Sequence, residues 1–292
     1  MKTLWNFKKS LFFILLGAQV LLAGHPAGKL FMVELSHIGN LSSTEPAAET
    51  VLPLDEFIND GFNGVLIRRW TGDMDAVHQS EFVEEMQEAG LWLAASDIAG
   101  SYDEDAAEIK RMANWGIDFV EIDEPFQGGS GGCHARHWLE TEADYLRLRG
   151  EISSDMPLLI TDVFCNDKIW NWNIDGLVQE VYGTNFYPSY LNKVVSWSNG
   201  SGKPGYVYIN AYNRQLYNKC EVQTEDMNKT WSQAAWDKNI KIILFSFATR
   251  CADCMTWGDC TSEPYNMVYG NNWPSWQRTA RSITAGHRVK FH

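Results

Sequence analysis

Two adjacent carboxylates, Asp123 and Glu124, end a segment with the character of a buried strand, Gly116-Ile-Asp-Phe-Val-Glu-Ile-Asp-Glu-Pro125. By the two-residue period of a strand, Glu121 and Asp123 share one face. A carboxylic acid paired with a carboxylate can protonate a leaving oxygen and stabilise or attack the carbon that it leaves. This is the chemistry that cleaves glycosidic bonds.

The proline after this pair restricts Glu124 to extended conformations. We therefore expect Asp123 to continue the inward row of the strand as nucleophile or electrostatic partner. Glu124 is expected to lean over the rim as general acid/base. Glu121 lies one layer deeper, where it is better placed to orient Asp123 than to touch a substrate.

The chain begins with a segment that is not expected to belong to the fold. Basic residues precede an apolar run, Leu11–Leu22, and small residues follow it. Residues 1–24 therefore predict a cleaved signal peptide, with a boundary as late as about residue 28, and the apolar run is short for a membrane span. We expect residues 29–292 to form one catalytic domain that is secreted, or periplasmic if the source is bacterial, with no membrane span in the mature protein.

Strand-like and helix-like segments alternate along this domain, which predicts a parallel sheet covered by helices. The expected strands are 30–36, 64–70, 91–98, 116–123, 157–162, 178–188, 205–212 and 240–248. The expected helices include 76–89, 102–115, 134–151, 224–238 and one from about 274, with a loop at 126–133. Eight strands, and no Gly-rich phosphate loop after the first, favour an α/β fold with a single closed (β/α)8 TIM barrel over an open doubly wound sheet.

Polar side chains gather at the predicted carboxyl ends of the strands, where such barrels carry their active sites. Flat tryptophan faces in the loops suit the C–H faces of sugars, and the chain has 13 tryptophans. Alternatively, such tryptophans simply fill gaps in the packing. The expected carbohydrate-binding residues are Glu34, Arg68, Trp70, Asp97, Glu121, Asp162, Asn185, Tyr187, Asn210 and Tyr212. Among them, Glu34, Asp97 and Asp162 are further candidates for the second carboxylate.

The strand that ends in Asp123 resembles a pattern of (β/α)8 glycoside hydrolases. The segment Gly116–Asp123 is similar to the fourth strand of retaining α-galactosidase-like barrels, and this resemblance implies that Asp123 is the nucleophile. The acidic fourth strand and Asn185-Phe-Tyr187 are also similar to chitinase-like barrels. The sequence departs from both patterns: Glu121 stands where the first group has a basic residue, and Pro125 stands where the second has its acid.

The overall charge and the cysteines narrow the possible partners and compartments. A formal net charge of -13 argues against a nucleic-acid partner. Six cysteines in an exported chain predict up to three disulfides, with Cys251 and Cys254 bridging a loop. Sequons at Asn40, Asn199 and Asn228 are potential glycan acceptors in a eukaryotic source.

The sequence therefore favours a secreted glycoside hydrolase with a poly- or oligosaccharide substrate, no cofactor and no dedicated metal site. Two alternatives stay open: a catalytically silent, lectin-like barrel, and a metal-dependent lyase or phosphodiesterase of the same fold. In the last case Glu34, Asp123 and Glu124 would hold the ion. The sequence leaves the oligomeric state open.

Overall fold

A computed structural model of the chain describes fourteen segments. These are residues 28–35, 54–67, 76–96, 101–123, 125–129, 132–135, 138–152, 155–162, 166–181, 187–210, 214–216, 219–221, 225–245 and 273–284.

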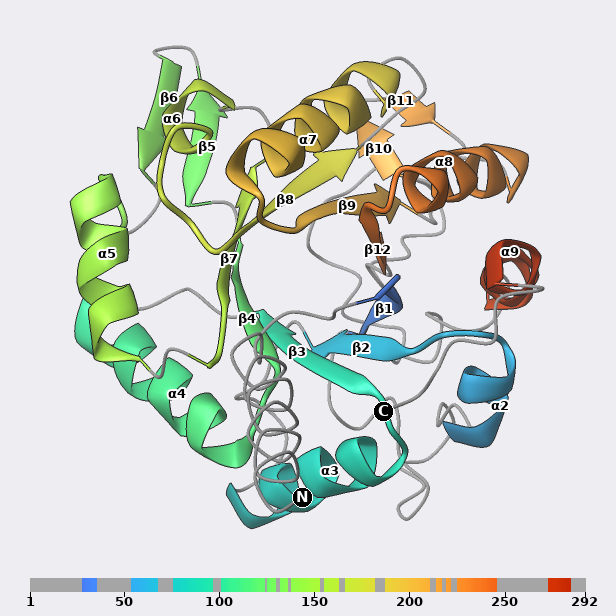
Figure 1. Ribbon diagram of the computed structural model, residues 1–292, viewed down its shortest axis with the longest axis horizontal. Helices are drawn as coiled ribbons and strands as arrows, with labels where there is room; N and C mark the ends of the chain where they lie inside the picture. The colour runs from blue at the N-terminus through green and yellow to red at the C-terminus, as the bar shows by residue number, and fades with distance from the viewer. Residues whose placement is uncertain are drawn as a thin grey trace, which may run out of the picture.

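Eight parallel strands close into one barrel, in the order β1-β12-β9-β8-β7-β4-β3-β2 (Figure 1). The strands are β1 (Phe31–Leu35), β2 (Gly64–Ile67), β3 (Trp92–Ser96), β4 (Phe119–Ile122), β7 (Leu158–Asp162), β8 (Gly176–Val181), β9 (Gly205–Asn210) and β12 (Lys241–Phe245). β1 pairs with both β2 and β12, so the first and last barrel strands seal the sheet. The predicted single (β/α)8 barrel is confirmed.

Helices follow the barrel strands along the chain and cover the outside of the barrel (Figure 1). They are α2 (Leu54–Asn59), α3 (Ala76–Glu88), α4 (Tyr102–Trp115), α5 (Glu142–Glu151), α6 (Asn166–Ile169), α7 (Tyr187–Ser201), α8 (Glu225–Asp237) and α9 (Trp273–Thr284). The last helix, α9, packs against α8 and reaches the end of α2, where Arg281 Nε donates to Asp60 Oδ1 at 2.6 Å. The helices after β1 and β7, α2 and α6, are the shortest of these.

Local sequence signals fix the ends of two helices. Ser101 and Glu104 form a capping box at the start of α4, and Gly116 ends that helix in the left-handed conformation at φ 82°. Thr141 and Asp144 form the corresponding box at the start of α5. Each box satisfies backbone N–H groups that a helix start would otherwise leave without acceptors.

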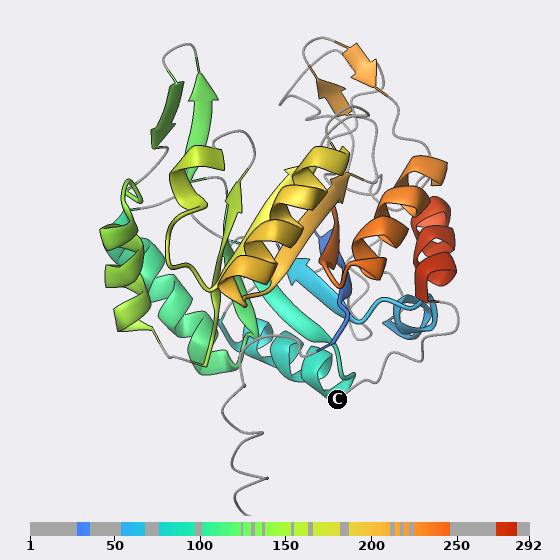
Figure 2. The same cartoon turned by 45° about the horizontal axis from the view of Figure 1, so that its top comes forward.

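Two hairpins that were not predicted rise from the end of the barrel toward which the strands point (Figure 2). They are β5 (Phe126–Gly129) with β6 (Gly132–Ala135), and β10 (Arg214–Leu216) with β11 (Lys219–Glu221), both antiparallel. The predicted loop at 126–133 is therefore a hairpin, whose glycines favour a tight reversal. The helix expected from residue 134 begins only at Glu142, behind its Thr141 cap.

The sixth barrel strand is also displaced from its predicted position. It runs from Gly176 to Val181, not from 178 to 188, and Tyr187 is the first residue of α7. Pro188 in the first turn favours the helix, because the N–H that proline lacks needs no helical partner there. The similarity of Asn185-Phe-Tyr187 to a tyrosine-bearing strand is therefore not matched by the structure at Tyr187.

At the amino-terminal rim of the barrel, one hydrogen-bond pattern occurs three times. An Asn or Asp directly before a strand accepts the backbone N–H of a residue in the strand beside it. The three bonds are Phe31 N to Asn63 Oδ1 at 2.8 Å, Leu93 N to Asp118 Oδ2 at 2.7 Å, and Leu158 N to Asp175 Oδ2 at 3.0 Å. Each bond fastens two neighbouring strands at the end opposite to the mouth.

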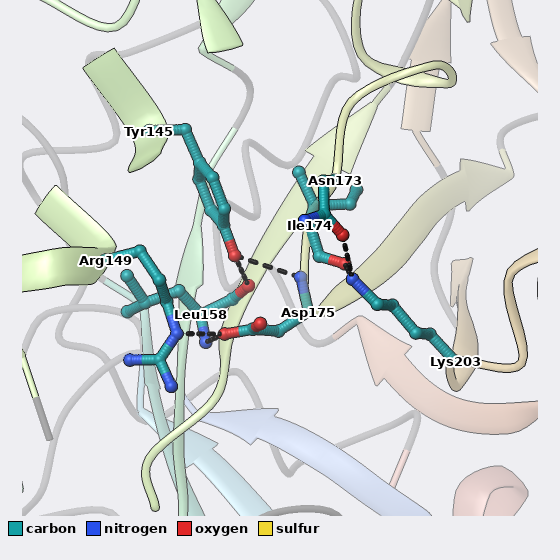
Figure 3. A network of polar contacts seen from close by, with 7 residues as sticks. All are labelled: Tyr145, Arg149, Leu158, Asn173, Ile174, Asp175 and Lys203. Carbon is teal, nitrogen blue, oxygen red and sulfur yellow. Dashed lines mark hydrogen bonds and ion pairs between the residues drawn. The ribbon is translucent and has the colours of Figure 1, made fainter. Parts of the chain in front are cut away.

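The third of these bonds belongs to a larger network (Figure 3). The Tyr145 hydroxyl donates to the Leu158 carbonyl at 3.0 Å and accepts the Asp175 N–H at 2.9 Å. Arg149 Nε lies 2.7 Å from Asp175 Oδ2. Lys203 Nζ donates to the Ile174 carbonyl at 2.6 Å. The network joins α5, β7 and the start of β8 at the amino-terminal end of the barrel, opposite to the end with the predicted site.

Candidate active site

The inside of the barrel is apolar toward its base and polar toward its mouth. Alternate residues of each strand point inward and form a separate cluster of buried side chains. This cluster contains Leu30, Met32, Leu66, Ala94, Phe119, Leu159, Val178, Tyr206, Tyr208 and Ile243. On five of the strands the next inward position is polar, and all five side chains are buried: Glu34, Ser96, Glu121, Thr161 and Glu180. Each is the last or next-to-last residue of its strand.

Glu121 is the best-defined member of this polar layer. Its side chain is 0% exposed. The Thr161 hydroxyl donates to Glu121 Oε1, and the Tyr208 hydroxyl donates to Oε2 at 3.4 Å. Hydroxyl groups from β7 and β9 thus hold a carboxylate of β4, so its orientation is fixed from two sides.

Asp123 directly follows β4 and comes next after Glu121 in the inward alternation. Its side chain is partly exposed, whereas Glu121 is completely covered. Asp123 therefore lies at the boundary between the packed interior and the mouth. Its predicted partner Glu124 lies outside the described residues.

Asp162 is placed differently from the other strand-end acids. It belongs to the row of Leu158 and Ile160, which packs outward against the helices. Its Oδ2 accepts the Trp170 indole N–H at 2.8 Å, and its carbonyl accepts Gln179 Nε2 at 2.6 Å. The structure does not bring Asp162 into the interior row with Glu121.

The remaining predicted site residues are described only in part. The backbone of Asn210 ends β9 and that of Tyr187 begins α7, but their side chains are not among those described. Four further residues of the predicted binding set lie outside the described residues: Arg68, Trp70, Asp97 and Tyr212, and the same holds for Asn185. All six cysteine side chains also fall there, so the disulfides stay a prediction.

Sequence reasoning missed Ser96, Thr161, Glu180 and Tyr208. The usable signal was the alternation itself: once Val178 is known to point inward, Glu180 must do so as well. The register gives the same result, because Glu180 lies opposite Tyr208 on the neighbouring strand. Among the described residues, the interior near the mouth therefore carries three glutamates, Glu34, Glu121 and Glu180.

A buried lysine at the other end of the barrel is a different matter. Lys241 is the first residue of β12, and its Nζ lies 5.7 Å from the centroid of the Tyr206 ring. Burial lowers the pKa of Lys241 to about 8. Such shifts often mark functional groups, but the amino-terminal end of a barrel serves stability. We assign Lys241 to the packing of the barrel floor.

No group of three or more His, Cys, Asp or Glu side chains among the described residues is arranged to hold a metal ion. No helix within the described ranges combines the length and apolarity of a membrane span.

Comparison with known proteins shows the fold but no family. No family model matches the chain, and no curated protein matches it in sequence. Two solved structures of GH113 β-1,4-mannanase superpose with TM-scores of 0.53 and 0.52, at 13% and 12% identity. They cover 80% and 78% of this chain, and 92% and 91% of their own. A D-psicose 3-epimerase from Clostridium cellulolyticum H10 has a TM-score of 0.49 at 10% identity, over 88% of this chain and 98% of its own. At 13% and 12% identity, the likeness to the mannanases shows that the chain has a TIM-barrel fold, and nothing finer.

Proposed function

We propose that this chain is a secreted glycoside hydrolase that cleaves a poly- or oligosaccharide with a pair of carboxyl groups at the mouth of the barrel. The observation that carries the proposal is the acidic row of β4. Glu121, held by Thr161 and Tyr208, lies directly below the partly exposed Asp123. A fixed carboxylate beneath a solvent-accessible one is an arrangement that positions a reacting group.

In this proposal Asp123 is the nucleophile or the electrostatic partner of the developing positive charge. Glycoside hydrolysis also needs a carboxylic acid that protonates the leaving oxygen. Glu124 is the first candidate for this role because it follows Asp123 at the rim. Among the described residues, Glu34 and Glu180 are the other inward carboxyl groups near the mouth.

Glu121 acts as a positioning residue in this mechanism. It is completely buried, and its two hydroxyl donors fix the carboxyl end of β4. Glu121 lies beneath Asp123, whose own carboxylate would favour a positively charged transition state at the mouth. Glycosidic cleavage passes through such an oxocarbenium-like state.

The mannanases of similar fold show that other chains use this kind of barrel on polysaccharides. Fold alone does not imply function, so this likeness supports the proposal without deciding it. The residues of the mouth carry the argument.

The test is cleavage of a polysaccharide panel by purified wild-type protein, with analysis of the released products. We expect Asp123→Asn and Glu124→Gln to lower kcat by at least roughly 10³-fold while the proteins stay folded, because each removes a reacting group. Asp155→Asn, an exposed substitution in the turn before β7 and at the opposite end of the barrel from Asp123, serves as the control. The variants Glu34→Gln and Glu180→Gln then show which carboxyl group completes the pair.

Three results would contradict the proposal. Unchanged cleavage by folded Asp123→Asn protein would remove Asp123 from the mechanism. Glycan binding without any turnover would favour the lectin-like barrel. Activity that a chelator abolishes and a divalent ion restores would favour the metal-dependent lyase or phosphodiesterase.

A further inference from the structure

A second feature with binding chemistry lies on the outer wall of the barrel. It is an open groove of ≈ 640 Å³ between the turn after α6 and the exposed side of α7. Its described lining consists of Trp170, Asn171, Ser189, Asn192, Lys193, Ser196 and Trp197. We call this feature the α7 groove.

The groove exists because one covering helix of the barrel is short. Among the described residues, the connection from β7 to β8 contains only α6, a helix of 4 residues, whereas α7 has 15 residues. Figure 1 shows α6 beside α7, where a full-length helix would otherwise cover the wall. The side of α7 that faces this gap therefore lacks the usual neighbouring helix.

The two tryptophans of the groove are half-buried and held in place. Both pack against the core that lies between the barrel and its helices. The indole N–H of Trp170 is bound to Asp162 Oδ2, which fixes the edge of the ring. Fixed aromatic rings with one accessible side suit the flat C–H faces of sugar rings.

The polar lining suits a sugar as well. Two amides and two hydroxyls, from Asn171, Asn192, Ser189 and Ser196, can donate to and accept from sugar hydroxyl groups. A glycan satisfies both kinds of surface.

The charge of the groove differs from that of the chain as a whole. The formal net charge of the chain is -13, but Lys193 is the one charged residue in the described lining. Its Nζ lies 5.9 Å from the centroid of the Trp170 ring and 5.6 Å from that of Tyr190. A cation beside a stacking platform favours a sugar that carries a carboxylate.

From these observations we propose that the α7 groove is a second glycan-binding site, specific for acidic glycans whose rings bear carboxylate groups. The rings stack on Trp170 and Trp197, and Lys193 pairs with a uronate carboxylate. This inference does not depend on catalysis at the mouth, since a non-catalytic barrel could hold the same site.

The test is calorimetric titration with two hexamers of matched size, α-1,4-linked galacturonate and maltohexaose. We expect the uronate hexamer to bind at least roughly fivefold more tightly, and 0.5 M NaCl to reduce this preference. Lys193→Gln should remove the preference, and Trp197→Ala should weaken binding of the uronate hexamer by roughly tenfold or more. Lys238→Gln removes the same charge from an exposed position outside the groove and should change nothing.

Two further measurements keep the test decisive. Because Trp197 is half-buried, the thermal unfolding of Trp197→Ala is measured alongside, and Asn192→Ala on the exposed side of the groove serves as a second variant. Asp123→Asn protein should bind the uronate hexamer as wild type does, which separates this site from the mouth.

Equal binding of the two hexamers would overturn the inference. So would binding that Lys193→Gln and Asn192→Ala leave unchanged, or binding that Asp123→Asn abolishes. The first two results leave the proposed cleavage at the mouth untouched, whereas the third would place the bound hexamer at the mouth.

Discussion

Glu121 is a fully buried carboxylate in the middle of a barrel, and such a group is costly unless polar partners surround it. Its hydroxyl partners, Thr161 and Tyr208, come from two other strands, and both are themselves buried. Apolar residues of similar shape at all three positions would pack the same space without this cost. We infer that the acidic group is kept for its effect on Asp123 above it.

This role predicts the behaviour of two substitutions at Thr161. Thr161→Val keeps the shape but removes a donor to Glu121, and we expect it to lower the free energy of unfolding by about 1–3 kcal/mol. It should also lower kcat more than it raises KM, because a displaced Glu121 misplaces the reacting group rather than the substrate. Thr161→Ser keeps the hydroxyl and should retain most of both. Urea denaturation and steady-state kinetics on the three proteins measure the effects.

Equal losses in the Ser and Val variants would show that the methyl group, not the hydroxyl, is what matters at Thr161. A loss of stability with unchanged kcat would confine Glu121 to a structural role.

At the scale of elements, the order of the eight barrel strands could be predicted from the sequence, because each is a short apolar run bounded by turn residues. The side on which residues point could be predicted only where polar and apolar residues alternate, as in Phe119-Val-Glu-Ile-Asp123. Leu158-Leu-Ile-Thr-Asp162 is apolar on both faces, so its sequence gives no contrast. Asp162 was therefore expected at the mouth although it points outward.

The start of α7 and the two hairpins were not predicted from the sequence, because these elements depend on contacts with distant parts of the chain. The α7 helix follows a segment of aromatic and β-branched residues that resembles a longer strand, and its amphipathic pattern is weak because one side faces the α7 groove. The two hairpins are short, and a two-stranded ribbon of this length has little stability without a surface to pack on. Local patterns do not carry that information.

One of the three side chains at the amino-terminal rim, Asp118, gives a prediction for the pH dependence of stability. Burial raises the pKa of Asp118 from its usual value to about 6, against the opposing effect of the Leu93 N–H. Between about pH 4 and pH 6 the folded protein thus keeps a proton on Asp118 that the unfolded chain has released. Stability from this group is present below pH 4 and is lost as the pH rises through 6.

Asp118→Asn removes this loss, since a neutral amide still offers an oxygen to the Leu93 N–H. Relative to wild type, we expect the free energy of unfolding of the variant to increase by roughly 2–3 kcal/mol between pH 4 and pH 7. Urea denaturation at several pH values measures the difference. The exposed Asp155→Asn is the control, and a difference that stays constant with pH would show that Asp118 is ionised in the folded protein throughout.

At the scale of the whole molecule, the barrel separates two kinds of chemistry. The amino-terminal rim is fastened by side-chain bonds to strand backbones, and the Tyr145 network lies there as well (Figure 3). The opposite end holds the inward glutamates and the two hairpins (Figure 2). Stability and proposed function thus occupy opposite ends, so substitutions at the mouth can be tested without dismantling the fold.

The proposed secretion predicts which sequon asparagines carry a glycan, because the asparagines differ in their exposure on the folded barrel. Asn199 lies exposed near the end of α7, whereas Asn228 in α8 is 2% exposed. A glycan on Asn228 would prevent α8 from packing, so molecules that fold and leave a eukaryotic secretory host should carry a glycan on Asn199 and none on Asn228.

Because Asn40 lies outside the described residues, the experiment starts from an Asn40→Gln background. There, Asn199→Gln should abolish the mobility shift produced by glycosidase treatment, and Asn228→Gln should leave that shift unchanged. Mass spectrometry that finds a glycopeptide containing Asn228 in folded, secreted protein would contradict the packing of α8 described above.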